Sequence, residues 1–205
     1  MNVMESDVEY GEGGMHMKEL ETERLILRKF TVDDAPQMYR NYASDHEVTR
    51  YLTWAPHKDE DATRDYLKHV EEEYAKDDTY MWALVLKDTS EVIGSVSVVH
   101  MTAECNGCEI GYCLGRPWWH QGIMSEAVRV VTRYLISEGF GRVEAVHDTE
   151  NVRSGRVMRN AGMQFEGIMR KSRSNNRGIV DCAIYSLIAE DLRNDPEVQG
   201  NSQDR

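Results

Sequence analysis

The feature that most constrains this chain is a strand-like segment that leads into a helix through a glycine. Residues 109–114 are β-prone, and Gly122 comes directly before an amphipathic segment that starts at Ile123. The start of a helix leaves backbone N–H groups without intrahelical partners and carries partial positive charge, so this junction can bind a phosphate group. Many strand–helix connections use glycine only to turn the chain, so other segments must decide between the two interpretations.

Length and composition indicate a single soluble domain. The chain has 205 residues, 40% of them hydrophobic, which is enough for one full core. We expect one domain over residues 19–192, between an acidic tail (1–18) and a polar tail (193–205) that are both disordered. No apolar run approaches the roughly 18 residues that a membrane span requires, and the N-terminal segment is acidic where a signal peptide is basic. A cytoplasmic protein without a membrane partner is therefore expected.

Charge and cysteine content narrow the kinds of partner. A formal net charge of −12 opposes nonspecific nucleic-acid binding and suits a cationic partner, although acidity also simply favours solubility. The four cysteines fit a reducing compartment. Cys105 and Cys108 are close in sequence, but Asn106-Gly107 between them is typical of a two-residue hairpin turn, which we favour over a metal site. No metal is predicted, and a homodimer is left open.

The order of the predicted elements is typical of one mixed sheet. Strands are expected at residues 24–28, 81–86, 92–100, 109–114, 142–146, 164–171 and 180–187. Helices are expected after a capping box at Thr31 and Asp34, between Gly122 and Gly139, and between a cap at Asn151 and Gly162. The first has apolar residues at helical spacing, and so has another helix expected near Asp59; they are Ala35, Met38, Tyr39 and Tyr42 in the first and Ala62, Tyr66, Val70 and Tyr74 in the second. This order predicts an α/β or α+β fold with about seven strands in one mixed sheet and about four helices.

Four segments stand out in this order: Leu20-Glu21-Thr22-Glu23-Arg24-Leu25-Ile26-Leu27-Arg28, Glu109-Ile110-Gly111-Tyr112, residues 119–127 and residues 151–163. Together they resemble the GNAT acetyltransferases, and among them the RimJ/RimL-like branch that acetylates N-termini of ribosomal proteins. The resemblance implies that the fourth and fifth strands (109–114 and 142–146) splay apart around acetyl-CoA. It also implies direct acetyl transfer to an amine acceptor, either a protein N-terminus or a small amine. A non-catalytic acetyl-CoA-binding regulator is the alternative.

The resemblance assigns the coenzyme A pyrophosphate to a loop and the first helical turn after it. The residues expected there are Trp119, His120, Gln121, Gly122, Ile123, Met124 and Ser125. Only Gly122 matches the family pattern Gln/Arg-x-x-Gly-x-Gly/Ala, so the contacts would be made by the backbone. Trp118 and Trp119 can equally be core or lid aromatics. Further expected binding groups are the backbone N–H groups of Cys113 or Leu114, together with Asn151 and Arg156. Arg153, Arg156 and Arg159 are expected near one helix face.

Acetyl transfer to an amine needs a base and a proton donor for the leaving thiolate. The resemblance makes Glu109 the base, directly or through water, although a surface strand residue is the plain alternative. His147-Asp148 is a rival base pair. Ser154 is the expected donor, because Met158 stands where many members have a tyrosine. A nucleophilic role for Cys113 is disfavoured, since no His–acid pair stands beside it. The acceptor loops are expected at residues 51–58 and 172–179.

Overall fold

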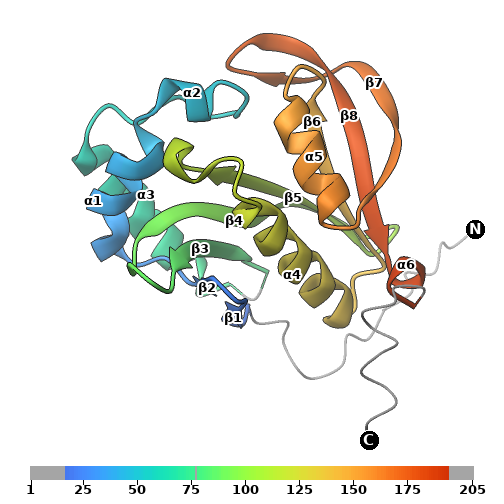
Figure 1. Ribbon diagram of the computed structural model, residues 1–205, viewed down its shortest axis with the longest axis horizontal. Helices are drawn as coiled ribbons and strands as arrows, with labels where there is room; N and C mark the ends of the chain where they lie inside the picture. The colour runs from blue at the N-terminus through green and yellow to red at the C-terminus, as the bar shows by residue number, and fades with distance from the viewer. Residues whose placement is uncertain (1–16, 77, 194–205) are drawn as a thin grey trace, which may run out of the picture.

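The centre of the molecule is one eight-stranded mixed sheet, seen in a computed structural model that describes residues 17–76 and 78–193 (Figure 1). The strand order is β1-β2-β3-β4-β5-β6-β8-β7, and only the β5–β6 pair is parallel. The strands are β1 (Leu20–Glu21), β2 (Leu25–Arg28), β3 (Met81–Leu86), β4 (Val92–Thr102), β5 (Gly107–Leu114), β6 (Arg142–Asp148), β7 (Gln164–Asn175) and β8 (Gly178–Ile188). The predicted mixed sheet is confirmed, with the short β1 as an additional strand.

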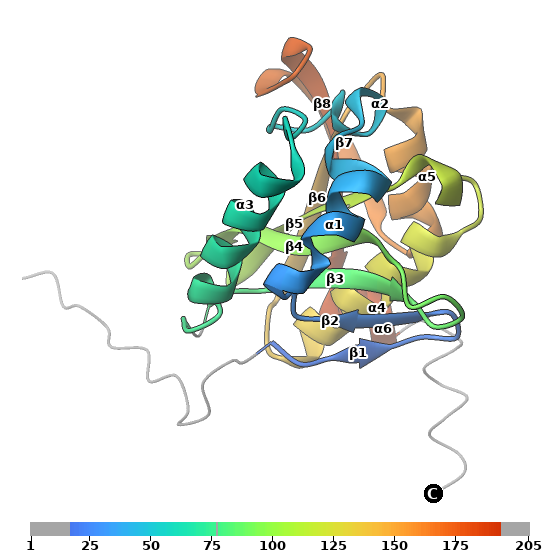
Figure 2. The same ribbon diagram turned by 90° about the vertical axis from the view of Figure 1, so that its left-hand side faces the viewer.

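Helices cover both faces of this sheet. α4 (Ile123–Ser137) and α5 (Val152–Asn160) pack on one face, while α1 (Ala35–Met38), α2 (His46–Thr49) and α3 (Glu60–Glu73) lie on the other (Figure 2). A short α6 (Ala189–Arg193) follows β8. The described residues thus hold six α-helices instead of about four. The difference arises because the segment after the capping box is broken into a 3₁₀ turn (Val32–Asp34), α1, a π-helical turn (Tyr39–Ala43) and α2.

The helix starts follow from local sequence. The backbone N–H of Thr31 donates to the Asp34 carboxylate (2.9 Å), so the predicted capping box is confirmed. Asp59 caps α3 by accepting from the Ala62 N–H (2.8 Å). The predicted apolar spacing marks the buried face of α3 only in part, because Val70 is buried and Tyr74 packs against the core but Tyr66 is 37% exposed. The buried residues of the helix are Thr63, Leu67 and Val70.

The core lies mainly between the sheet and α4. The predicted apolar positions of α4 are buried: Ala127, Val128, Val131, Tyr134 and Leu135. Each fully buried Val or Leu side chain contributes roughly 1.5–3 kcal/mol to folding relative to an exposed one. The helix ends before Gly139, which has a φ of +109° and takes a conformation that glycine adopts without strain. Burial along this face therefore fixes α4 against the sheet, and with it the position of its N-terminus.

The turn between β4 and β5 differs from the prediction. Thr102 pairs with Gly107, so four residues, 103–106, connect the strands instead of the two residues Asn106-Gly107. Asn106 takes a φ of +45° inside this longer turn. Asn-Gly sequences favour such a left-handed backbone, which is why the sequence predicted a two-residue turn. Within residues 17–76 and 78–193, no group of three or more His, Cys, Asp or Glu side chains could hold a metal ion. No helix in the same ranges is long and apolar enough to cross a membrane.

The predicted tails lie mostly outside the described residues. At their inner boundaries, Met17 is buried and Lys18 bonds to Glu138 (2.8 Å), so these two residues belong to the packed part of the chain. Residue 193 closes α6.

The sheet opens between its two central strands. β5 and β6 pair only from Gly107 with Arg142 to Ile110 with Ala145. Beyond Ile110, β5 continues beside β4 alone, and β6 continues beside β8 alone. The predicted separation of these strands is therefore confirmed, and the space between their ends is where a ligand can reach unpaired backbone groups.

Candidate active site

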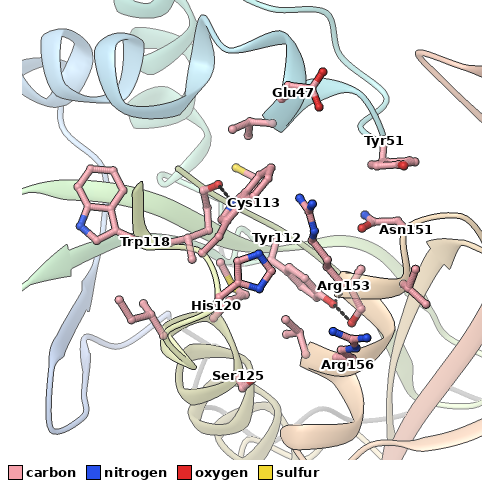
Figure 3. A pocket seen from close by; sticks show the side chains of 18 of the residues that line it. Glu47, Tyr51, Tyr112, Cys113, Trp118, His120, Ser125, Asn151, Arg153 and Arg156 are labelled. Atoms are coloured by element: carbon pink, nitrogen blue, oxygen red, sulfur yellow. Dashed lines mark hydrogen bonds between the residues drawn. The ribbon is translucent and has the colours of Figure 1, made fainter. Parts of the chain in front are cut away.

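A cavity of about 440 Å³ occupies the opening between β5 and β6 (Figure 3). Its walls are the end of β5, the loop into α4, the first turns of α4 and α5, and the segment from α2 to Leu52. Most predicted site residues line it: Cys113, Leu114, Trp119, His120, Gly122, Ile123, Met124, Ser125, Asn151, Ser154 and Arg156. Gln121 and Glu109 do not. The structure thus brings the predicted cofactor residues together with Ser154.

The start of α4 provides the anion-binding end of this cavity. Gly122 has a φ of +76° and precedes the helix without a capping side chain. The first intrahelical bond joins the Glu126 N–H to the Gly122 carbonyl (3.0 Å), and helix geometry leaves the N–H groups before it without partners in the helix. Those groups and the positive end of the helix dipole lie at the cavity wall, which fits a pyrophosphate without basic side chains.

The open edge of β5 presents one of the two predicted backbone donors. Cys113 pairs with Ser95, and the Gly115 N–H donates to the Ile93 carbonyl (2.8 Å), so the odd-numbered N–H groups are directed at β4. The Leu114 N–H is consequently directed at the opening. The Leu114 carbonyl accepts from the Trp119 indole N–H (2.7 Å), which makes Trp119 a wall of the cavity.

Cys113 lines the cavity only through its side chain. Its Sγ lies 3.4 Å from the Ser95 hydroxyl, and burial raises the pKa of the Cys113 thiol to about 11. A thiol with that pKa is protonated near neutral pH and is a poor nucleophile. This agrees with direct transfer of the acetyl group.

Ser154 forms a hydroxyl pair with a residue that sequence analysis did not select. The Tyr112 Oη lies 2.8 Å from the Ser154 Oγ and also donates to the Ser154 carbonyl (3.1 Å; dashed lines in Figure 3). Burial raises the pKa of the Tyr112 phenol well above its usual value, so the phenol keeps its proton. Met158, where many family members have a tyrosine, is buried in the core. The phenol beside Ser154 therefore comes from β5 instead of from α5.

The three arginines of α5 do not act together. Arg153 extends into the cavity between Cys113 and Asn151 and stacks on the Trp119 ring (4.8 Å to its centroid; Figure 3). Arg156 also lines the cavity. Arg159 points elsewhere and donates to the Tyr185 phenol (3.0 Å). The predicted single arginine face is therefore wrong for Arg159.

Asn151 lines the cavity and occupies the N-cap position of α5, as predicted, but its side chain makes no capping hydrogen bond. The Asn151 backbone N–H donates to the Asp148 carbonyl (2.7 Å), which fixes the turn between β6 and α5. The side chain stays available to a ligand in the cavity.

The structure places Glu109 away from the cavity wall. Its carboxylate accepts from the Arg173 guanidinium (3.0 Å). Side chains alternate along a strand, so Glu109 lies on the same face of β5 as Cys113, with Gly111 between them. Gly111 has no side chain, so β5 itself places no side chain between Glu109 and the cavity, although Val99 of β4 lies beside it: a Cβ at Gly111 would be 3.1 Å from the Val99 Cγ1.

The rival pair of His147 and Asp148 is not a pair in the structure. His147 is buried, and its Nδ1 donates to the backbone carbonyl of Asp148 (2.7 Å). The Asp148 carboxylate instead binds Asn175 (3.0 Å) and Arg177 (2.8 Å). Burial lowers the pKa of His147, and its Nε2, which has no partner among the described residues, faces α5. Neither side chain lines the cavity, which argues against His147 as the base.

The two segments predicted as acceptor loops meet over the site. Asn176, at the tip of the β7–β8 hairpin, donates from its side-chain amide to the carbonyls of Thr49 (2.9 Å) and Trp54 (2.8 Å). Glu47 and Tyr51 extend the cavity wall beside this contact (Figure 3). Sequence reasoning missed Glu47 because it belongs to a short helix with no motif of its own. A sheet that opens beside an anion-binding helix start places the protein in a broad class, the α/β proteins that can bind a phosphate-bearing ligand.

Comparison with known proteins identifies the family within that class. The acetyltransferase (GNAT) domain matches residues 24–164, and the chain belongs to the GNAT acetyltransferase family. It is 33% identical to the N-acetyltransferase p20 of Bacillus licheniformis, over 84% of this chain and 97% of that protein. It is 26% identical to the ribosomal protein uS5-alanine N-acetyltransferase of Escherichia coli, over 72% of this chain and 79% of that one. This similarity supports the RimJ/RimL-like branch.

A solved structure agrees with the family assignment. The GNAT-family acetyltransferase of Bacillus anthracis superposes with a TM-score of 0.73 at 25% identity, covering 84% of this chain and 99% of that one. The chain is accordingly an N-acetyltransferase with acetyl-CoA as its co-substrate, and the cavity between β5 and β6 is the site that fits it.

Proposed function

We propose that this enzyme transfers the acetyl group of acetyl-CoA directly to the N-terminal α-amine of a protein. The observation that carries the proposal is that one cavity holds the start of α4, the free Leu114 N–H and the Ser154–Tyr112 hydroxyl pair. The E. coli relative, named for alanine N-acetylation of ribosomal protein uS5, supports a protein N-terminus as acceptor. A small amine is the alternative acceptor.

Each residue has a separate task in this reaction. The backbone from Gly122 to Ser125 holds the pyrophosphate, and acetyl-CoA supplies an activated acetyl thioester. The Leu114 N–H stabilises the oxyanion that forms when the amine attacks the thioester carbonyl carbon. As the C–N bond forms and the C–S bond breaks, Ser154 passes its hydroxyl proton to the departing sulfur and regains a proton from water, with Tyr112 orienting its hydroxyl. Glu109 accepts the amine proton through water along the Gly111 face of β5.

The assay measures release of free coenzyme A with three kinds of acceptor. They are a peptide that begins with alanine, the same peptide with a blocked N-terminus, and a panel of small amines. Turnover with the free peptide alone supports the proposal, whereas turnover only with small amines contradicts a protein acceptor. Binding of coenzyme A without turnover on any acceptor would favour a non-catalytic regulator.

The base is tested by Glu109→Gln. Removing the proton acceptor is expected to lower kcat by about 10²–10⁴ and leave the Kd of coenzyme A nearly unchanged. Glu144→Gln is a matched control, because Glu144 is the register partner of Glu109 on β6 and pairs with Arg142 (2.8 Å). Wild-type turnover in Glu109→Gln would show that Glu109 is only a structural ion-pair partner of Arg173.

A further inference from the structure

We propose that Arg24, which lies just before β2, is a positioning residue for the pyrophosphate loop. Arg24 is outside the cavity, yet it contacts two residues of the loop–helix junction. Its Nε donates to the Glu126 carboxylate (2.7 Å), and its Nη1 donates to the Gln121 carbonyl (2.9 Å). The Arg24 backbone N–H donates to the same carboxylate (3.1 Å). Arg24 thus contacts Gln121 before Gly122 and Glu126 after it. This inference rests on the function proposed above.

The bond to Gln121 sets the direction of a neighbouring donor. Across a trans peptide the C=O of one residue and the N–H of the next point in opposite directions. Arg24 draws the Gln121 carbonyl toward itself, so the Gly122 N–H points away from Arg24, to the side on which Gly122 lines the cavity. Gln121 is further tied by its side-chain amide to the Pro117 carbonyl (2.9 Å). The peptide is therefore set in its binding orientation before any ligand arrives.

The bond to Glu126 removes an unfavourable charge. Glu126 lies in the first turn of α4, where an uncompensated carboxylate would repel a pyrophosphate bound to the same helix start. Partial burial opposes ionisation of Glu126, but hydrogen bonds from Thr22 and Arg24 outweigh it and lower the pKa of the carboxyl. Glu126 is thus a full negative charge that Arg24 neutralises. Positioning and neutralisation both predict that Arg24 controls affinity for the pyrophosphate part of the co-substrate.

The test measures the Kd of coenzyme A by calorimetry in a set of variants. Arg24→Gln loses the charge and both side-chain bonds, and we expect Kd to rise about 10- to 100-fold. Arg24→Lys keeps the charge but not the two-point geometry and should lie between wild type and Arg24→Gln. Glu126→Gln alone should change Kd less than about threefold, because a neutral amide does not repel phosphate. In the double variant, loss of the repelling carboxylate should recover much of the affinity that Arg24→Gln loses.

A second substrate separates positioning from general stability. Acetyl-pantetheine lacks the pyrophosphate, so its kcat/KM should change less than about threefold in Arg24→Gln, while kcat/KM for acetyl-CoA falls with the affinity. Equal losses with both substrates would show a merely structural role and overturn the inference. Lys87→Gln is the matched control, because Lys87 makes an ion pair with Glu21 (3.0 Å) near the same β1–β2 turn without touching the loop.

The outcomes distinguish this inference from the function on which it rests. If wild-type protein binds coenzyme A and Arg24→Gln binds it within twofold of wild type, Arg24 does not position the loop and only this inference fails. If wild-type protein binds acetyl-pantetheine as tightly as coenzyme A, the pyrophosphate site itself is absent and the proposed binding mode fails with it.

Discussion

Gly155→Ala tests how closely α5 must approach β6. Gly155 is buried in α5, and a Cβ built at this position would lie 2.6 Å from the His147 Nε2 and 3.1 Å from its Cε1. The first distance is about 0.8 Å shorter than an ordinary van der Waals contact. His147 cannot easily move away, because its Nδ1 is bonded to the Asp148 carbonyl and its ring packs on Tyr185 (5.8 Å between centroids). The helix must therefore shift.

Two opposing effects set the size of this change. Overpacking of a core costs roughly 1–3 kcal/mol, whereas replacing glycine by alanine inside a helix stabilises it by about 1 kcal/mol. Because the overlap is close to 1 Å, we expect overpacking to dominate and the free energy of unfolding to fall by about 1–2 kcal/mol. For a domain of this size that lowers Tm by roughly 2–8 °C. A displaced α5 also carries Ser154 away from its position, so kcat should fall about tenfold to a hundredfold.

Thermal unfolding and steady-state kinetics on five proteins check this reasoning: wild type, Gly155→Ala, His147→Ala, the double variant and a control. His147→Ala in the Gly155→Ala background removes the clashing ring, so the double-mutant cycle should show a favourable coupling energy of about 1 kcal/mol or more. Gly141→Ala is the control, because the nearest atom to its new Cβ is 3.6 Å away and Tm should hardly change. A Gly155→Ala protein as stable and as active as wild type would refute the close approach of α5 to His147.

Three further sites are tested by substitution: the anion site at Gly122, the Ser154–Tyr112 hydroxyl pair, and the Asp148 carboxylate that binds residues of the β7–β8 hairpin. Gly122→Asp should weaken coenzyme A binding by calorimetry far more than Gly122→Asn, which tolerates the same left-handed backbone. A Cβ at Gly122 would lie 3.7 Å from the Arg24 Nη2, so the aspartate adds a negative charge at the loop and competes with Gln121 and Glu126 for Arg24, whereas asparagine is neutral. Equal binding by both variants would contradict the site. Ser154→Ala should lower kcat about tenfold to a hundredfold, and Tyr112→Phe should lower it less. An unchanged kcat in Ser154→Ala would leave water as the proton donor to the coenzyme A thiolate. Asp148→Asn should lower the free energy of unfolding at pH 7 by about 1–2 kcal/mol, because it weakens the hydrogen bonds that the buried Asp148 carboxylate accepts from Asn175 (3.0 Å) and from the exposed Arg177 (2.8 Å). Burial opposes ionisation of Asp148, but the hydrogen bonds to its carboxylate outweigh this effect and lower its folded pKa below 3.8. The contribution of Asp148 to the free energy of unfolding is therefore present above pH 3.8 and is lost as the pH falls through the folded pKa. Urea titrations of wild type and Asp148→Asn should accordingly converge in acid.

Elements with strong periodicity could be predicted from the sequence. The strands around Met81–Leu86 and Val92–Thr102 and the helix Ile123–Ser137 follow from regular apolar spacing bounded by turn residues. The segment from Val32 to Thr49 has apolar residues at helical spacing, but the sequence does not show that a π-helical turn, Tyr39–Ala43, interrupts the helix. Tyr66 belongs to the apolar spacing of α3 because tyrosine counts as apolar by type, although its polar end often reaches solvent.

The residues of the site likewise divide into those that local sequence predicts and those that depend on contacts between distant segments. The anion-binding start of α4 could be predicted because it depends on local backbone geometry, which Gly122 indicates directly. The Tyr112–Ser154 contact joins residues 42 positions apart and depends on strand register, which a single sequence does not specify. Glu109 has an ion-pair partner, Arg173, that lies 64 residues away, so its orientation could not be anticipated either.

The short parallel seam of the sheet, the four residue pairs between β5 and β6, also affects the order in which the protein folds. Strands β1 to β5 pair with neighbours by antiparallel ladders, whereas the parallel seam needs the whole α4 crossover before its four residue pairs can form. The bridge from Asn176 to Thr49 closes a separation of 127 residues. Closing such a long loop costs more chain entropy than closing a short one, so we expect this bridge and the cavity walls to form late. Their amide hydrogens should then exchange by local opening, while those of β3 and β4 exchange only on global unfolding. We thus expect the site that binds substrates to be the last part of the molecule to assemble.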